Sequence, residues 1–386
     1  MTRPVSYGVD VGGTKILAVA LSAQDDVLAE RRVPTPHQAT GTAARGQVQD
    51  APGEEPAPGA APGAAAGAAR PHPGVALADA IVDVLEQVHD DVVHAAARGE
   101  LARLHDVAPL SEIPIGIGVA GLVDTDGVLR FSPNLASAAG ANIGELVTAR
   151  LDRHGRACGG RVDVAPIRAL NDANCTAYAE LLLGAAQGMR YGLVITIGTG
   201  IGGALVVDGR VHVGARGFAG EIGHMVVDPN GPPCPCGQRG CWERFAAGSG
   251  LTRLARDAAI AGTLHEVVRL AGGDPELVTG EHVTAAAAAG DADALRVMGE
   301  LGWWVGLGLA NLVAILDPEQ IVVGGGLGHA GEMLLVPTRR ALASLVEGGA
   351  ARGVVPVVEA GLGEQAGAVG AALAARSGSS DAVTDR

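Results

Sequence analysis

The chain has 386 residues, of which 48% are hydrophobic and only 2% aromatic, and its formal net charge is −14. This length suffices for about two domains with an aliphatic core of substantial size. The acidic balance argues against nucleic acid or an anionic membrane as the main partner. It still leaves room for a phosphate ligand, because backbone N–H groups bind phosphate without net positive charge.

The composition also bounds the cellular setting. The first 13 residues, MTRPVSYGVDVGG, hold no apolar segment of signal length, and no run approaches the roughly 20 apolar residues that span a bilayer. The chain has five cysteines, three of them closely spaced, which is more typical of a reducing compartment than of a disulfide framework. The sequence therefore predicts a soluble cytoplasmic protein.

Residues 7–21, YGVDVGGTKILAVAL, predict a strand, a glycine turn and a second strand. Asp10 lies at the end of the first strand, and the turn contains Gly12, Gly13 and Thr14. Glycines there would let a phosphate approach backbone N–H groups, and Thr14 can add a hydroxyl. A hairpin of this kind is also common as a plain turn, so alone it indicates little.

Residues 191–207, YGLVITIGTGIGGALVV, repeat this design, with a turn that contains Gly198, Thr199 and Gly200. Two similar hairpins nearly half a chain apart indicate an internal duplication with a nucleotide phosphate chain between the turns. A chance pairing of two ordinary hairpins is the alternative.

Residues 35–73 consist of Ala, Pro, Gly and scattered charges. Such a segment cannot bury enough apolar surface to offset its ordering entropy, so we expect a disordered surface insert without a catalytic role. From residue 75 to about residue 104 the apolar residues follow a helical period. A buried strand is predicted at 113–120, and the hairpin after it leads to Asn134, which is either turn punctuation or a ligand-binding side chain.

A short strand at 167–170 precedes the sequence NDAN, which opens a helix. Asp172 is either the N-cap of that helix or a carboxylate that faces a cleft and accepts a proton from a substrate hydroxyl. The residues alone leave these two interpretations about even.

The segment 221–243, EIGHMVVDPNGPPCPCGQRGCWE, concentrates residues that bind metals. His224, Cys234, Cys236 and Cys241 supply four ligands, enough for a closed tetrahedral zinc site. Gly and Pro fill the gaps, so the backbone can fold around a metal but cannot form a helix. The alternative, ordinary buried cysteines, rarely places three within eight residues.

The C-terminal part predicts a helix capped by Ser249, a long helix at 291–316, a buried strand at 321–323, a last strand at 354–359 and a helix at 365–375. The glycines at 324–326 follow a strand and would let a flat group such as a nucleotide base approach the backbone.

With these motifs, the chain resembles the ROK-family sugar kinases, and most of all the bacterial ATP-dependent glucokinases among them. The resemblance covers nearly the whole chain apart from residues 35–73 and the tail. The motifs that carry it are DVGGTK at 10–15, NDAN at 171–174, GTGIGG at 198–203, EIGH at 221–224, CPCGQRGCWE at 234–243 and IVVGGGL at 321–327.

The resemblance implies an α/β, actin-like ATPase (ribonuclease H-like) fold with two lobes around a nucleotide and sugar cleft. It implies a small lobe at 1–135, to which a C-terminal helix at 364–376 returns, and a large lobe at 136–363 with the zinc loop and the adenosine-side glycines.

The resemblance also implies roles for individual residues. Asp172 would be the catalytic base. The residues that bind the sugar would be Asn134, Asn171, Asp172, Glu221, His224 and Glu243. The residues that hold ATP would be Asp10, Gly12, Gly13, Thr14, Lys15, Gly198, Thr199, Gly200 and Gly325. A structural zinc ion would be bound by His224, Cys234, Cys236 and Cys241.

The implied reaction is the phosphorylation of glucose at its 6-hydroxyl by ATP and Mg²⁺ in a homo-oligomeric enzyme. The alternatives are a kinase for fructose, N-acetylmannosamine or N-acetylglucosamine, and a polyphosphate donor. A sugar-responsive repressor of the same family would carry an N-terminal helix-turn-helix domain, whereas the first predicted strand begins near residue 7. A zinc-stabilised binding protein without catalysis is the last alternative.

Overall fold

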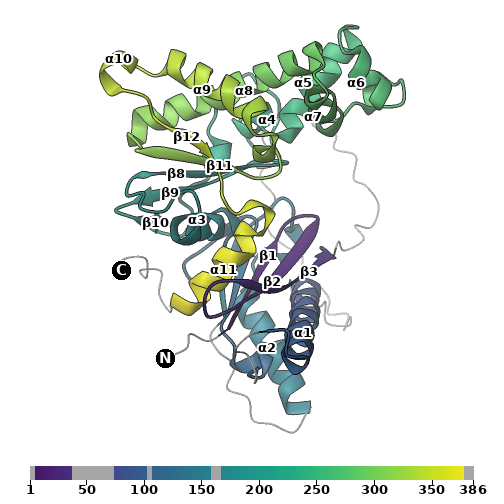
Figure 1. The fold of residues 1–386 in the computed structure, drawn as a ribbon, viewed down its shortest axis with the longest axis vertical. Helices are drawn as coiled ribbons and strands as arrows, with labels where there is room; N and C mark the ends of the chain where they lie inside the picture. Colours follow the sequence, from purple (N-terminus) through teal and green to yellow (C-terminus); the bar gives the residue numbers. More distant parts are fainter. Residues whose placement is uncertain (1–4, 37–73, 102–106, 158–166, 378–386) are drawn as a thin grey trace, which may run out of the picture.

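The computed structural model describes residues 5–36, 74–101, 107–157 and 167–377. Most of the predicted insert at 35–73 and most of the polar tail therefore lie outside the described residues. Within them the chain forms two five-stranded mixed sheets, one above the other in Figure 1, with helices between and around them.

The first sheet has the strand order β3-β2-β1-β4-β7. β1 pairs antiparallel with β2 and parallel with β4, β2 pairs antiparallel with β3, and β4 pairs parallel with β7. Its strands are β1 (Ser6–Val11), β2 (Lys15–Leu21), β3 (Val27–Pro34), β4 (Ile115–Val119) and β7 (Ile167–Asn171). The first glycine hairpin predicted from the sequence is therefore confirmed as β1 and β2.

The second sheet, of order β10-β9-β8-β11-β12, repeats the first strand for strand, with the same parallel and antiparallel pairs. Its strands are β8 (Gly192–Ile197), β9 (Ile201–Val207), β10 (Arg210–His212), β11 (Gln320–Gly324) and β12 (Val357–Glu359). The second glycine hairpin is β8 and β9, so the two hairpins occupy equivalent places. This correspondence supports the internal duplication.

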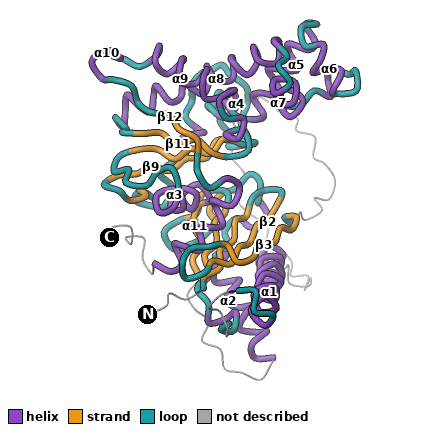
Figure 2. The backbone as a smooth tube through the Cα atoms, viewed as in Figure 1, coloured by secondary structure: helices purple, strands orange, loops and turns teal. Residues whose placement is uncertain are grey.

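Helices form layers on both sheets and between them (Figure 2). α1 (Val75–Ala97) and α2 (Ile143–Ala157) pack on the first sheet, and α3 (Asp172–Leu183) and α11 (Ala366–Ser377) lie between the sheets. The remaining helices lie beyond the second sheet: α4 (Glu243–Ala246), α5 (Gly248–Ile260), α6 (His265–Leu270), α7 (Gly280–Ala288), α8 (Ala292–Leu316), α9 (Glu332–Leu345) and α10 (Gly349–Arg352).

The alanine-rich composition permits a very close approach of α11 to its neighbours. A Cβ atom at Gly8 or Gly116 would lie 1.8 or 1.9 Å from a backbone oxygen of α11, and one at Gly370 would lie 1.7 Å from the Cys175 oxygen. The helix therefore contacts β1, β4 and α3 almost backbone to backbone, which leaves no room for aromatic side chains.

Several predicted boundaries are wrong. The helix from residue 75 ends at Ala97 rather than near 104, and β12 begins only at Val357. Ser249 does not cap a helix, because α5 begins at Gly248 with Ala247 as its N-cap. β7 belongs to the first sheet, so that sheet continues past residue 135, where the lobe boundary was expected.

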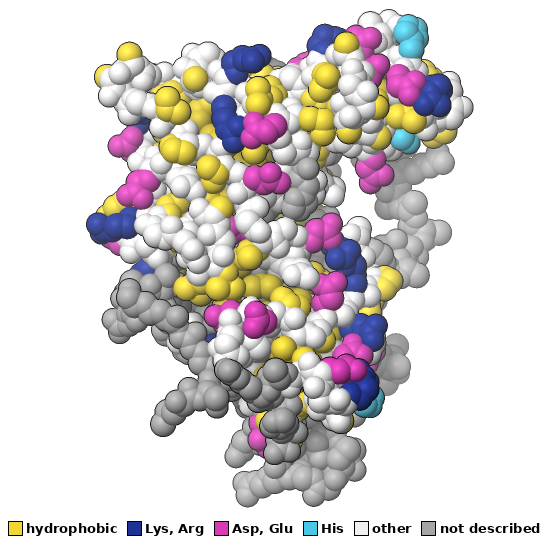
Figure 3. All heavy atoms as spheres, in the orientation of Figure 1, with side chains coloured by type: hydrophobic (Ala, Val, Ile, Leu, Met, Phe, Trp, Pro, Cys, Tyr) yellow, Lys and Arg dark blue, Asp and Glu magenta, His cyan; other side chains and the backbone are white. Residues whose placement is uncertain are grey.

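The expectation that no segment could span a bilayer also needs a correction. Among the described helices, α8 is long and apolar enough to cross a membrane by length and composition. Half of its apolar window is buried in the protein, and its buried side chains join those of β8 and β11 in one core cluster. Core helices of globular proteins show the same pattern, so this is weak evidence for a membrane span. On the face in Figure 3, acidic and basic side chains are interspersed.

Candidate active site

The predicted site residues come from the ends of strands in both sheets and from the cysteine-rich loop. Asp10 is the next-to-last residue of β1, Asp172 follows β7, the turn at 198–200 joins β8 to β9, and Gly325 follows β11. Because equivalent strand ends of the two sheets face each other, segments far apart in the sequence meet at one place.

Two adjoining cavities occupy this place. The larger, about 360 Å³, is lined by Asp172, by the turn at 198–200 and by the predicted sugar-binding residues Asn134, Asn171, Glu221, His224 and Glu243. The smaller, about 210 Å³, is lined by Asp10, Lys15 and the glycines at 324–326, together with Asp172. Asp172 and Gly325 line both cavities, so the carboxylate lies where the predicted sugar and nucleotide sites join.

The local structure around Asp172 excludes one of its two interpretations, the N-cap. Asn171 is the N-cap of α3, since its Oδ1 accepts a hydrogen bond from the Asn174 N–H at 3.1 Å. The Asn171 Nδ2 donates to the Gly121 carbonyl at 3.1 Å, which ties this cap to the end of β4. The N-cap interpretation of Asp172 is therefore wrong, and its carboxylate accepts only from the neighbouring Ala173 N–H at 2.9 Å among the bonds described.

The carboxyl groups at the base of the cleft have shifted pKa values. Burial, followed by the negative charge of Asp172, raises the pKa of Asp10 to about 7, although Lys15 opposes the shift. Burial also raises the pKa of Asp172. Two carboxylates in one confined, poorly solvated space favour a bound cation, which would restore their ionised forms.

The two glycine turns contact the sugar-side residues. A Cβ atom at Gly13 would lie 2.8 Å from the Cβ of Asn134, and one at Gly200 would lie 2.6 Å from Oε2 of Glu243. A larger residue at Gly13 would therefore press on the Asn134 side chain near its backbone, and one at Gly200 would displace the carboxylate of Glu243. The first turn lines neither of the two cavities: Gly12, Gly13 and Thr14 are absent from their walls. The second turn lines the larger cavity with Gly198, Thr199 and Gly200.

Lys15, a predicted phosphate-binding residue, is held by a carboxylate. Its Nζ lies 3.1 Å from Oε2 of Glu364, which also lies 3.0 Å from Nη2 of Arg32. Hydrogen bonding to Lys15, then the charges of Lys15 and Arg32, lower the pKa of Glu364. Glu364 stands in the short turn before α11 and lines the smaller cavity.

The cysteine-rich loop brings its four predicted ligands together. The ligand atoms of His224, Cys234, Cys236 and Cys241 all lie within 4.8 Å of one another. The Cys236 and Cys241 Sγ atoms are 3.6 Å apart, and Nδ1 of His224 is 3.7 Å from the Cys234 Sγ. Burial raises the pKa of the Cys234 thiol, and a bound cation would favour the thiolate. Three sulfurs and one imidazole nitrogen at this spacing fit a tetrahedral zinc ion.

Glycine turns and the core anchor this loop. Gly237 and Gly240 have φ angles of 95° and 69°, and the Cys234 N–H donates to the Gln238 carbonyl at 2.8 Å. The fully buried Trp242 follows the last cysteine and donates its Nε1–H to the Trp304 carbonyl on α8 at 2.8 Å.

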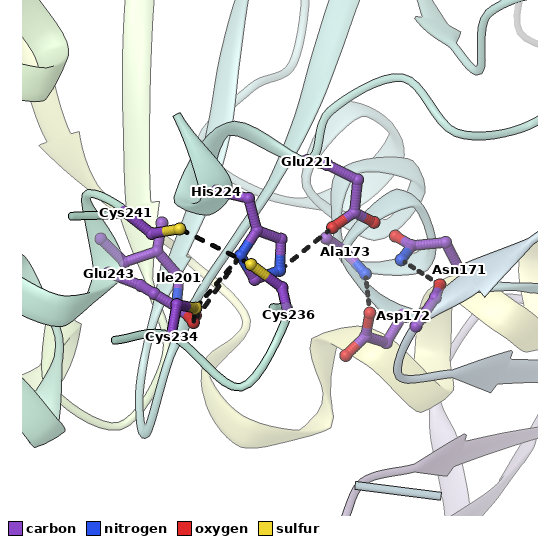
Figure 4. Close-up of polar contacts among 11 residues, drawn as sticks. Asn171, Asp172, Ala173, Ile201, Glu221, His224, Cys234, Cys236, Cys241 and Glu243 are labelled. Atoms are coloured by element: carbon purple, nitrogen blue, oxygen red, sulfur yellow. Dashed lines mark hydrogen bonds and ion pairs between the residues drawn. The ribbon is translucent and has the colours of Figure 1, made fainter. Parts of the chain in front are cut away.

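The same loop presents polar side chains to the cleft. Nε2 of His224 lies 3.8 Å from Oε2 of Glu221, and its Nδ1 lies 3.7 Å from Oε1 of Glu243 (Figure 4). Glu221 lies between His224 and the Asn171–Asp172 pair in this view. Burial raises the pKa of Glu221, with His224 opposing the shift.

Sequence reasoning missed some residues of the cleft. Thr196, Arg244, Ser249 and Glu364 line the cavities but belong to no motif that was singled out for binding. Arg244 follows Glu243 directly, so an arginine beside a predicted sugar-binding carboxylate was the available signal. A separate cavity of about 680 Å³ lies along β7, with Asn171 in its wall but not Asp172.

Comparison with known proteins fits this geometry. The sequence model of the ROK family matches residues 99–377. The chain is 32% identical to the glucokinase of Streptomyces coelicolor over 376 residues, which cover 96% of this chain and 98% of that protein. It is also 28% identical to the xylose repressor of Bacillus subtilis over 239 residues, which cover 62% of this chain and 55% of the repressor.

The structural comparison agrees with the sequence comparison. A ROK-family glucokinase from Streptomyces griseus, solved in complex with glucose and AMPPNP, matches with a TM-score of 0.73 and 31% identity, covering 96% of this chain and 99% of the other. The chain belongs to the ROK family, and the predicted actin-like ATPase fold is confirmed.

Proposed function

We propose that this protein is an ATP-dependent sugar kinase that phosphorylates glucose at the 6-hydroxyl. The observation that carries the proposal is the position of Asp172, which lines both the cavity with the sugar-side carboxylates and the cavity with Asp10 and Lys15. The similarity to the Streptomyces glucokinases along almost the whole chain supports glucose as the acceptor.

In this proposal the sugar hydroxyls are bound by Asn171, Glu221, His224 and Glu243. Asn134, which lies against Gly13 of the first glycine turn, lines the same cavity. Asp172 accepts the proton of the 6-hydroxyl as that oxygen attacks the γ-phosphorus of ATP in line. The bond from the γ-phosphorus to the β–γ bridging oxygen breaks, and ADP leaves. The backbone N–H groups of the two glycine turns, with Lys15, stabilise charge on the transferring phosphoryl group. Gly325 lies beside the adenosine.

Two metal ions would assist these residues. Magnesium, bound with the nucleotide, would neutralise phosphate charge, and Asp10 is the residue that would hold it or one of its waters. Zinc bound to the three cysteines and His224 would have no open position, so its role is structural. Bound there, it would fix the loop that carries Glu221 and Glu243, and with one ring nitrogen of His224 used as a ligand the other nitrogen would carry the proton. A cytoplasmic location and a homo-oligomer stay predictions.

A substrate panel tests the proposal. The protein is incubated with glucose, mannose, fructose, N-acetylglucosamine or N-acetylmannosamine, with either ATP or polyphosphate, and ADP and sugar phosphate are measured separately. We expect glucose and ATP to give the highest kcat/KM, with phosphate on the 6-oxygen by NMR. A preference for another hexose would reject the specificity but keep the kinase, and no transfer to any sugar would reject both.

A further inference from the structure

The cleft is strongly acidic for a site proposed to bind ATP. Five carboxylates line the two cavities: Asp10, Asp172, Glu221, Glu243 and Glu364. Apart from His224, their described walls contain two cations, Lys15 and Arg244, and Lys15 is already paired with Glu364 at 3.1 Å. A polyphosphate that enters this space needs a cation whose charge is not already neutralised.

Arg244 meets that requirement. It is partly buried in α4, and among the described residues no carboxylate oxygen lies within ion-pair distance of its guanidinium. Its Nη1 donates to the Ser249 Oγ at 3.2 Å, and its Nε is buried without a hydrogen-bond partner. Donor capacity is therefore left over on a charged side chain in the wall of the larger cavity.

The surroundings place Arg244 on the phosphate side of the cleft. Arg244 and Ser249 line the cavity together with Gly198, Thr199 and Gly200. Ser249 stands in the first turn of α5, and the N–H of the preceding residue, Gly248, donates to the Gly198 carbonyl at 2.8 Å. The guanidinium therefore shares this wall with the second glycine turn and the N-terminus of a 13-residue helix, both of which favour anions.

A neighbouring arginine shows what a structural role looks like in the same region. Arg253 on α5 lies over the Phe245 ring, 5.4 Å from its centroid, and its Nη1 lies 3.8 Å from the Asp257 carboxylate. Its buried Nε, like that of Arg244, has no hydrogen-bond partner among the described residues. Arg253 nevertheless has an aromatic and an anionic partner within the protein. Neither kind of contact is found for Arg244 among the described residues, and Arg253 does not line the cleft.

We propose that Arg244 binds the phosphate chain of the phosphoryl donor, next to the glycine turn at 198–200. The planar guanidinium can donate two parallel hydrogen bonds to phosphate oxygens, which suits a donor that must be held against five carboxylates. This inference rests on the proposed function for the identity of the donor, an adenine nucleotide. Arg244 is therefore a second cation, in addition to Lys15, that binds the phosphoryl donor.

The test compares Arg244→Met with Arg253→Met, which removes a charge from the same region outside the cleft. Binding of ADP and of adenosine is measured by calorimetry, and KM is measured for ATP and for glucose. We expect Arg244→Met to weaken ADP binding by roughly 10-fold or more, because charge-assisted hydrogen bonds to phosphate are lost. Adenosine binding and the KM for glucose should change less than about twofold, and Arg253→Met should leave all four values near wild type.

The possible results distinguish failure of the Arg244 proposal from failure of the proposed kinase function. Unchanged ADP binding in Arg244→Met, or an equal loss for adenosine, overturns the phosphate contact. If the wild-type protein binds ADP but phosphorylates no sugar, the proposed function fails while the comparison of ADP with adenosine still tests Arg244. Arg244→Lys keeps the charge without the fork, and we expect ADP binding between wild type and Arg244→Met. Should Arg244→Met fail to fold, Arg244→Gln replaces it, with the same expected loss for ADP and not adenosine.

Discussion

At the residue scale, the proposed chemistry depends on two carboxyl groups near the ends of strands that flank β4. Asp10 is the next-to-last residue of β1 and Asp172 follows β7, and both line the smaller cavity. The charge of Asp172 is one cause of the raised pKa of Asp10. Two neighbouring carboxylates repel each other unless a cation is bound between them or to a nucleotide beside them. In the protein without ligands, their proximity therefore lowers the stability of the folded state.

This cost predicts a pH-dependent effect of Asp10→Asn. The folded pKa of Asp10, about 7, lies above its ordinary value of 3.8, so the folded state binds the proton more tightly than the unfolded state. Stability is therefore lost as pH rises through this window, and the charged group destabilises the fold above it. Without ligands, Asp10→Asn should melt about 1–2 °C above wild type at pH 8, a gain of about 1 kcal/mol, and the gain should disappear toward pH 4.

The control for this prediction is Asp83→Asn, which removes a carboxylate from an exposed position on α1. It should give no pH-dependent gain. Equal melting temperatures of Asp10→Asn and wild type at both pH values would show that Asp10 carries no such cost.

The sequence identified candidate site residues, but it could not decide the role of each one. It listed Asp172 but could not decide between an N-cap and a cleft carboxylate, because the two differ in which of two adjacent side chains turns back onto the helix. The structure gives the cap to Asn171. Glu364 was missed because it pairs with Lys15, 349 positions away, which no local pattern encodes. Arg244 follows Glu243 directly and bonds Ser249 only five residues away, so it was missed because it belongs to no recognised motif.

At the scale of elements, the loop at 221–243 joins the candidate metal ligands to the proposed sugar-binding side of the cleft. Three cysteines within eight residues predicted its ligand set, and the structure brings all four ligand atoms within 4.8 Å. Glu243 follows the last ligand after one residue, and the Cys234 Sγ lies 3.0 Å from its Oε1. Any movement of the cluster should therefore displace Glu243.

We expect Cys236→Ser to lose most of the bound zinc and to raise the KM for glucose on the order of 10-fold, since disturbed metal sites typically lose 10- to 100-fold in affinity or activity. Zinc is measured by mass spectrometry of metals and KM in the coupled assay. The matched control is Cys175→Ala, a buried cysteine of α3 outside the cluster, which should keep its zinc. Full zinc content and an unchanged KM in Cys236→Ser would refute the link.

The prediction of elements succeeded where patterns were local and strong. Alternating β-branched residues around glycine turns gave both hairpins correctly. β3 was missed because its sequence, VLAERRVP, belongs to an exposed edge strand whose charged side chains hide the alternation. Ser249 is a common cap residue by type, but the helix starts at Gly248, two residues earlier than a Ser249 cap requires, where the Gly248 N–H contacts the Gly198 carbonyl.

At the scale of the whole molecule, one buried carboxylate joins the segments that connect the two sheets. Glu180 on α3 is fully buried and accepts hydrogen bonds from three backbone N–H groups, those of Ala185, Gly361 and Leu362, at 2.8, 3.0 and 3.0 Å. The last two lie where the chain leaves β12 and approaches α11 between the sheets (Figure 1). The sequence could not predict the two long-range bonds, because Gly361 and Leu362 are 181 and 182 positions away.

Glu180→Ala should therefore destabilise the protein by about 3 kcal/mol, because three charge-assisted hydrogen bonds are lost and their N–H groups stay buried. Glu180→Gln, which keeps the shape but one acceptor oxygen only, should lie between. The measurement is the urea midpoint of unfolding, with the exposed Glu276→Ala as the control. A midpoint of Glu180→Ala equal to wild type would show that the segment at 361–362 is held by other contacts.

The central claim is that Asp172 is the base of a sugar kinase, and its most direct test separates binding from turnover. Asp172→Ala is assayed for phosphorylation of glucose by ATP, and its affinities for glucose and ADP are measured by calorimetry. We expect kcat to fall by roughly 10²- to 10⁴-fold, the usual contribution of a positioned general base, while both ligands still bind. A variant that keeps most of its kcat would contradict the account.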